Sequence, residues 1–300
     1  MKSPRLKSMF ASTLIIALAM WPAMAAAGEL HFSVVDREVL EARLKSYKGN
    51  DSQREATLKG LFEEAGCTGE KLTEQPVKGL KQPNIICELP GNTDSVIVVG
   101  AHYDHIDRGD GVIDNWSGAS MLPSLYQMLK NQPRQYTFLF ISFAGEEKGL
   151  VGSKFYVKGL APEQVKKIKA MICMDTLALG PTEVWVSHSD QALIHQLLRI
   201  ALSLKAPLTR MDVEEVGESD EESFIQQKVP TITLHSLTQK TLSVLHSPQD
   251  NYSAVHFDDY YESYCLVSAY LALLDQEGLP ATAPGSNPSA PGAESTQQKH

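Results

Sequence analysis

Residues that can bind metal ions follow several apolar stretches of the sequence. Histidine and acidic residues come directly after "VIVVGA", "FLFISFAG" and "MICM", and a further histidine, within "HSPQDN", comes after "TITL". An isolated acidic pair is most often a solvated surface feature, but several such groups, each placed beyond an apolar run, indicate a common site. The candidate ligands are His102, Asp114, Glu147, Asp175 and His246.

Two imidazoles and three carboxylates form a ligand set that suits two zinc ions. Zn²⁺ accepts nitrogen and oxygen ligands, and one ligand can bridge a pair of ions that lie roughly 3.5–4 Å apart. Glu146 stands beside Glu147 and remains free to take a proton from a water molecule that the metals activate. This combination predicts metal-assisted hydrolysis with Glu146 as the general base.

Other ionisable residues have simpler interpretations. The acidic run "DVEEVGESDEES" from Asp212 reads as a solvated loop, although it precedes a strand and could line the cleft. Four histidines are interpreted as surface or core residues: His188, His195, His235 and His256. Three polar residues near the first candidate ligands are interpreted as loop solvation: His105, Asp107 and Asp110.

The elements that would position these residues alternate along the chain. Apolar runs predict strands at 83–91, 94–102, 136–145, 169–176, 183–188 and 229–236. Helical periodicity predicts helices at 35–49, 52–66, 117–132, 149–158, 191–205 and 257–277. Apolar strands that alternate with helices indicate an α/β fold, with a mostly parallel sheet covered by helices on both faces. In such sheets ligands bind beyond the carboxyl ends of the strands, where the candidate ligands fall.

The two ends of the chain differ in composition from the middle. Residues 1–27 combine a basic start, a short apolar run and small-residue cleavage sites, which predicts a secretory signal peptide. Residues 278–300 are rich in Pro, Ala and Ser and predict a disordered tail. We therefore expect one catalytic domain at 28–277, exported to the periplasm or secreted, without stable membrane insertion of the mature chain. We also expect a monomer.

Charge and cysteine content add two further expectations. The formal net charge of −9 makes a nucleic-acid partner improbable. Of the four cysteines, Cys67 follows a predicted helix and Cys87 ends a predicted strand. Because export would permit a disulfide, we expect these two to pair. Cys173 and Cys265 read as core residues. None of the cysteines has the spacing of a zinc-thiolate site.

The motifs "GAHYDH", "DNWSGAS", "FAGEEKGLVGS", "MDT" and "HSPQDN" together resemble the co-catalytic zinc aminopeptidases, a family that includes aminopeptidase Y and secreted bacterial leucyl aminopeptidases. The resemblance implies a three-layer α/β/α fold and two zinc ions. It assigns His102 and Asp175 to one ion and Glu147 and His246 to the other, with Asp114 as the bridge. It also implies that the Asp104 carboxylate orients His102, and that the peptide after Asp114 is cis.

Two stretches depart from the family pattern. In "SDEESF" the family often has a histidine where Glu221 stands, and Val216, Gly217 and Glu218 occupy the stretch where some relatives carry an oxyanion-stabilising tyrosine. The sequence therefore leaves the oxyanion-stabilising group unassigned. The extra acid at Glu221 would favour positively charged substrates if it faced the cleft.

The resemblance implies an aminopeptidase that acts on peptides with a free N-terminus. Glutaminyl cyclases share the fold, but they use one zinc ion and cyclise N-terminal glutamine without water. Other relatives, such as transferrin receptor, have lost the metals and serve as binding proteins. The complete ligand set and the retained Glu146 favour hydrolysis over both alternatives.

Overall fold

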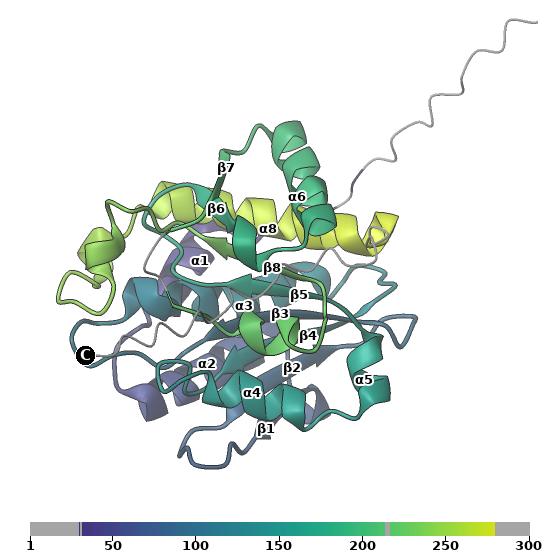
Figure 1. Ribbon diagram of the computed structural model, residues 1–300, viewed down its shortest axis with the longest axis horizontal. Helices are drawn as coiled ribbons and strands as arrows, with labels where there is room; N and C mark the ends of the chain where they lie inside the picture. Colours follow the sequence, from purple (N-terminus) through teal and green to yellow (C-terminus); the bar gives the residue numbers. More distant parts are fainter. Residues whose placement is uncertain (1–29, 31, 214–216, 280–300) are drawn as a thin grey trace, which may run out of the picture.

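The computed structural model describes residues 30, 32–213 and 217–279. The predicted signal peptide at 1–27 and positions 280–300 of the predicted tail lie outside these residues. Within the described part, eight strands form one sheet (Figure 1), in the order β1-β2-β4-β3-β5-β8-β6-β7. The strands are β1 (Leu72–Gln75), β2 (Asn84–Leu89), β3 (Val96–His102), β4 (Thr137–Phe143), β5 (Ile168–Met174), β6 (Thr182–Trp185), β7 (Leu208–Met211) and β8 (Thr231–His235).

The middle of the sheet is parallel and its flanks are mixed. β4, β3, β5 and β8 run parallel to one another, whereas β2 pairs antiparallel with β4 and β6 pairs antiparallel with β8. The predicted mostly parallel sheet is therefore confirmed. The parallel strands are buried on both faces, which explains why they read as continuous apolar runs.

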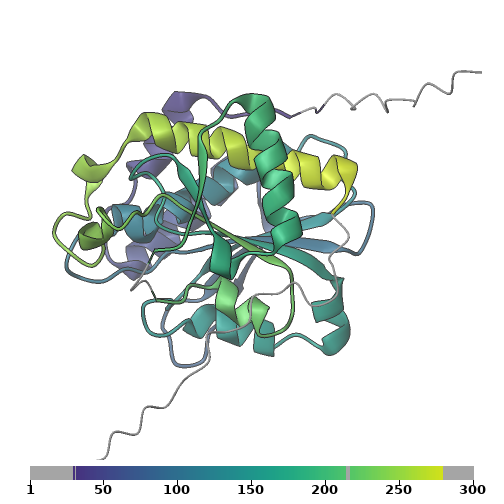
Figure 2. The same ribbon diagram turned by 45° about the horizontal axis from the view of Figure 1, so that its top comes forward.

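Helices cover both faces of the sheet, so helices, sheet and helices form three layers (Figure 2). The described helices are α1 (Arg37–Leu44), α2 (Asp51–Ala65), α3 (Ser117–Leu129), α4 (Val151–Lys158), α5 (Pro162–Lys167), α6 (Gln191–Leu204), α7 (Glu221–Ile225) and α8 (Phe257–Glu277). The larger core lies between the sheet and α1, α2, α3, α6 and α8, and the smaller one lies beneath α4, α5 and α7. Val98 and Val99 point into different cores, as the alternation of side chains along a strand requires.

Local signals fix both ends of α2. The side chain of Asn50 accepts from the N–H of Gln53, whose side chain accepts in return from the N–H of Asn50. Gly66 ends the helix with φ +97°, a conformation that favours glycine. The next residue, Cys67, forms a disulfide with Cys87 of β2. The helix is therefore joined covalently to the sheet.

None of the helices in the described part of the chain is both long enough and apolar enough to cross a membrane.

Candidate metal centre

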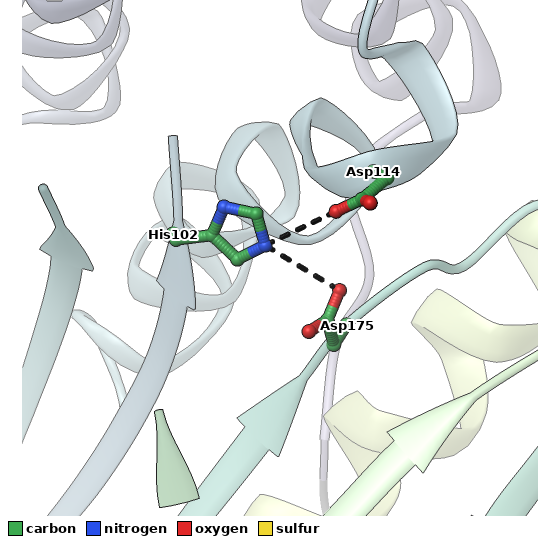
Figure 3. Close-up of side chains that lie close together, drawn as sticks. All are labelled: His102, Asp114 and Asp175. Atoms are coloured by element: carbon green, nitrogen blue, oxygen red, sulfur yellow. Dashed lines mark ion pairs between the residues drawn. The ribbon is translucent and has the colours of Figure 1, made fainter. Parts of the chain in front are cut away.

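The sheet brings the first group of candidate ligands together. His102 ends β3, and Asp175 comes directly after β5, which pairs in parallel with β3. Asp114 lies in the turn Val112–Trp116 that leads into α3. The Nε2 atom of His102 lies 3.2 Å from Oδ1 of Asp114 and 3.6 Å from Oδ1 of Asp175. Figure 3 shows the imidazole directed between the two carboxylates.

A second group shares Asp114. The Nε2 atom of His246 lies 3.2 Å from Oδ2 of Asp114 and 3.1 Å from Oε2 of Glu147. Each carboxylate oxygen of Asp114 therefore faces a different group, which is the arrangement of a bridging ligand. The peptide bond between Asp114 and Asn115 is cis. The five residues expected as ligands thus form two clusters, divided in the way that the sequence resemblance implies.

The buried polar atoms of these clusters fit a pair of divalent cations. Within the described residues, Nε2 of His102, Oδ1 of Asp175 and Oε1 of Glu147 are buried without a hydrogen-bond partner. Such atoms are rare in folded proteins because losing water without a replacement is costly. Imidazole nitrogen and carboxylate oxygen are ligands that zinc accepts. The donor set therefore fits zinc ions at both clusters.

The pKa values of the two histidines reflect the surplus of acid around them. Burial opposes protonation of His102, but Glu146 and Asp175 outweigh it and hold its pKa well above the usual range. The hydrogen bond to Asp114 raises the pKa of His246 to about 9. Both shifts indicate a negative potential that attracts cations.

Asp104 contacts both His102 and Glu146. The Nδ1 atom of His102 lies 3.2 Å from the backbone oxygen of Asp104, whereas the carboxylate oxygen is 3.7 Å away, beyond hydrogen-bonding range. The carboxylate accepts a hydrogen bond from the N–H of Glu146 at 3.1 Å. The Asp104 carboxylate therefore faces His102 as an ion-pair partner and positions Glu146 by a hydrogen bond, while the backbone oxygen of Asp104 lies closest to the imidazole.

Glu146 borders both clusters without belonging to either. Its Oε2 atom lies 3.9 Å from Nε2 of His102, and its side chain lines the same cavity as Asp114 and Asp175. Burial raises the pKa of Glu146 to about 10; Asp175 adds to the rise and His102 opposes it. Bound cations would offset this rise and leave the carboxylate free to exchange a proton with a group held at the ligands.

Ser219 is a site residue that the sequence did not reveal. Its hydroxyl donates to Oδ2 of Asp175 at 2.6 Å and leaves Oδ1 facing His102. It lies within the acidic run interpreted as a solvated loop. That interpretation is wrong for Asp220 and Glu221, because both are fully buried. A serine among acids carries no pattern from which this contact could be predicted.

Glu221 does not face the cavity. Its Oε1 atom lies 2.7 Å from Nδ1 of His188, and it is absent from the cavity wall. Glu221 therefore gives no reason to expect a preference for positively charged substrates. Gly217 and Glu218 do line the cavity, whereas Val216 lies outside the described residues.

Both clusters open into one cavity of about 540 Å³. Ligand sites of this size are typical for small molecules and short peptide segments. Its apolar wall consists of Leu150, Trp185, Val213, Leu237, Leu242 and Leu245. Its acidic floor carries Asp114, Glu146, Glu147 and Asp175. The cavity can therefore receive an apolar side chain beside the two ligand clusters.

Comparison with known proteins identifies the family to which the chain belongs. Residues 84–270 match Peptidase family M28, and the chain belongs to this family. The match covers the sheet from β2 onwards and all five candidate ligands. It leaves out α1, α2 and β1.

Two curated relatives are similar over about two thirds of the chain. Leupeptin-inactivating enzyme 1 of Streptomyces exfoliatus is 28% identical over 69% of this chain and 48% of its own length. Aminopeptidase YwaD of Bacillus subtilis is 26% identical over 66% of this chain and 44% of its own length. The chain thus spans less than half the length of these curated relatives.

Solved structures show the same fold. Legionella LapA superposes with a TM-score of 0.69 at 21% identity, covering 80% of this chain and 72% of that structure. A glutaminyl cyclase from an Acidobacteriales bacterium also reaches a TM-score of 0.69, at 18% identity, covering 85% of this chain and 100% of that structure. The fold is therefore common to hydrolases and cyclases, so the reaction has to be argued from the site.

Proposed function

We propose that this protein is an exported zinc-dependent aminopeptidase that hydrolyses the N-terminal peptide bond of peptide substrates. The observation that carries the proposal is the sharing of Asp114 by two ligand clusters, each completed by a histidine and a second carboxylate. A co-catalytic pair of ions needs this arrangement. Membership of Peptidase family M28 and similarity to aminopeptidases support it.

His102 and Asp175 would hold one zinc ion and Glu147 and His246 the other, with Asp114 between them. Two zinc ions at these positions would supply Lewis-acid chemistry that activates water and polarises the peptide carbonyl. Glu146 accepts the proton of the attacking water and delivers it to the leaving amine. The N–H of Glu146 is bonded to Asp104, so its carboxylate is held at the edge of the ligand clusters.

The cavity supports action at a free N-terminus. Its apolar lining receives the side chain of the first residue, and Glu218 is an acidic lining residue that is not a proposed ligand and stays available to the free amine. We propose a peptide with a free N-terminus as substrate, and a monomer as the active form.

Export is proposed from two features of the chain. Residues 1–27 have the composition of a secretory signal peptide, and a disulfide such as Cys67–Cys87 persists in oxidising compartments. Fractionation of cells that express the full chain tests it: we expect processed protein in the periplasm or the medium. Unprocessed protein confined to the cytoplasm would contradict export.

The central experiment measures release of 4-nitroaniline from a panel of aminoacyl-4-nitroanilides by the purified protein. We expect release that a chelator abolishes and that falls about 10²–10⁴-fold in Glu146→Gln, with zinc content unchanged. Glu163→Gln, at an exposed position of α5, is the control. N-acetylated substrates should not be cleaved.

A parallel assay separates hydrolysis from cyclisation. A peptide that begins with glutamine should lose that residue as free glutamine if the protein is an aminopeptidase. Formation of pyroglutamate without release of amino acids would contradict the proposal and favour a cyclase, whose fold the chain shares.

A further inference from the structure

Arg54 of α2 is a buried arginine whose guanidinium reaches toward the metal ligands. The residue is fully buried, and its hydrogen bonds go to backbone carbonyls. Nη1 donates to Tyr103 at 3.2 Å, and Nη2 donates to Asp110 and, at 3.0 Å, to Gly111. These three carbonyls belong to residues 103–113, the ligand loop, which connects His102 with Asp114. One side chain thus holds both halves of this loop.

Asp250 holds the same loop from its other end. Its carboxylate accepts from the N–H of Ile113 at 2.7 Å and from the N–H of Asp114 at 3.2 Å. Its backbone oxygen accepts from the N–H of Asp110 at 2.7 Å. Asp250 lies four positions after His246. Its hydrogen bonds therefore join the ligand loop to the segment that carries the last ligand.

The two segments lie in direct backbone contact at Gly109. A Cβ atom at this position would lie 2.3 Å from the oxygen of Ser247 and 2.9 Å from that of Asp250. No side chain fits there without movement of the backbone. The position of His246 relative to Asp114 is therefore set by backbone packing and by the hydrogen bonds to Arg54 and Asp250.

The remaining ligands of the first cluster are anchored differently. His102 ends β3, and the N–H of Asp175 extends the pairing of β5 with β8 by donating to Leu234 at 3.0 Å. Sheet hydrogen bonds hold these two ligands. His246, by contrast, lies on a loop, and half of its side chain is exposed. The second cluster therefore depends more than the first on what fixes the ligand loop.

We propose that Arg54 is a positioning residue that pre-organises the bridging ligand Asp114 and, together with Asp250, sets the affinity of the second cluster for metal. The inference rests on the proposed dizinc site. Arg54 lies outside residues 84–270, which match the family, so the proposal concerns a part of this chain that the family match does not cover. Arg54 also places a positive charge close to Asp51, Asp104, Asp114 and Asp250 and balances part of their charge.

Metal titration of the metal-free protein tests the proposal. Zn²⁺ binding is measured by calorimetry, and Co²⁺ binding by the visible absorption that each added equivalent produces. We expect two equivalents for the unmodified chain. In Arg54→Met the second equivalent should bind roughly 10–100-fold more weakly, with a smaller change in the first, since outer residues that fix ligands have effects of this size.

Arg43→Met is the matched control. Arg43 is also a buried arginine, but its guanidinium bonds to Ser124 and Gln127 of α3 and touches no ligand segment. We expect its loss to lower the melting temperature and leave both metal affinities unchanged. A purely structural role for Arg54 would give the same result as this control. The ratio of the two affinities therefore separates positioning from general stability.

Two milder variants keep the test decisive if Arg54→Met does not fold. Arg54→Lys retains the charge but replaces the two nitrogens that bond the ligand loop with a single ammonium nitrogen. Asp250→Asn replaces one acceptor by a donor that faces a backbone N–H. Both should weaken the second equivalent selectively. If both variants bound two equivalents of zinc as tightly as the unmodified chain, the proposal for Arg54 would be overturned and the proposed function would stand. An unmodified chain that binds no zinc would overturn the proposed function and the inference with it.

Discussion

The carboxylate of Glu221 lies 2.7 Å from Nδ1 of His188, and the imidazole of His188 stacks on Trp185 with ring centroids 4.0 Å apart. Glu221 stands where the sequence resemblance implies a histidine, and it contacts a histidine from another part of the chain. The pair lies behind Trp185, which lines the cavity. The contact therefore supports the cavity wall and does not act on the substrate.

The His188–Glu221 pair predicts a pH-dependent contribution to stability. Burial opposes protonation of His188, but the hydrogen bond that its imidazole donates to Glu221 outweighs it and raises the pKa of His188 above the usual value. A group whose pKa is raised on folding stabilises the fold below its unfolded pKa, about 6.5, and loses that contribution as pH rises through the folded pKa. His188→Gln should therefore lower the free energy of unfolding by more at pH 6 than at pH 9.

Urea unfolding at the two pH values measures this difference. His195→Gln serves as the control because His195 is exposed on α6. An equal loss at both pH values in His188→Gln would mean that the imidazole is not charged in the folded protein.

Asp104 is predicted to affect turnover through Glu146. Asp104→Ala removes the acceptor of the Glu146 N–H and should lower the turnover number about 5- to 10-fold, since one hydrogen bond is worth about 1 kcal/mol. Asp104→Asn retains an acceptor oxygen and should remain close to the unmodified enzyme. Zinc content is measured alongside. If the zinc content of Asp104→Ala fell by the same factor as its turnover number, Asp104 would act on the metal site and not through Glu146.

The Cys67–Cys87 disulfide is predicted to stabilise the fold substantially. It closes a loop with a sequence separation of 20 residues, for which the chain-entropy model predicts about 3 kcal/mol. Denaturant unfolding of Cys67→Ser/Cys87→Ser measures the loss. Cys265→Ser, at a free and partly buried cysteine, is the control. A double variant as stable as the control would contradict the prediction.

Gly118 is predicted to be intolerant of a side chain. A Cβ atom there would lie 2.6 Å from Oδ1 of Asn115 and 2.6 Å from the oxygen of Met174. Gly118→Ala should destabilise the fold by about 1–3 kcal/mol, as overpacking does, and weaken metal binding by displacing the turn that carries Asp114. Gly60→Ala on α2 meets no atom within 4 Å and should be neutral or stabilising. Thermal unfolding and zinc content compare the two variants.

Much of the fold was predictable because its central strands are buried on both faces. The predicted strands at 94–102, 136–145 and 169–176 correspond to β3, β4 and β5. The short strands β1 and β7 were missed. Each has four residues with little burial, so no apolar pattern marks them. Their pairing depends on neighbouring strands that are distant in sequence.

The ligand residues could be proposed from sequence because each follows a recognisable strand or motif. The supporting contacts could not be, because they are made by backbone groups or by residues without a distinctive pattern. No sequence pattern singles out Arg54 within the predicted helix at 52–66, yet it is fully buried against the ligand loop. Asp250 lies within the recognised motif "HSPQDN", but only the structure reveals its bonds to Ile113 and Asp114.

The pairing of β3 with β5 has a consequence for the choice of metal. Neighbouring strands lie about 4.8 Å apart, and this spacing limits how far His102 and Asp175 can separate without breaking backbone hydrogen bonds. His102 and Asp175 would therefore keep nearly the same backbone positions whichever divalent ion occupied the first cluster. Adjustment to a larger ion such as Ca²⁺, which takes six to eight oxygen ligands at longer distances, would fall on the loop ligands.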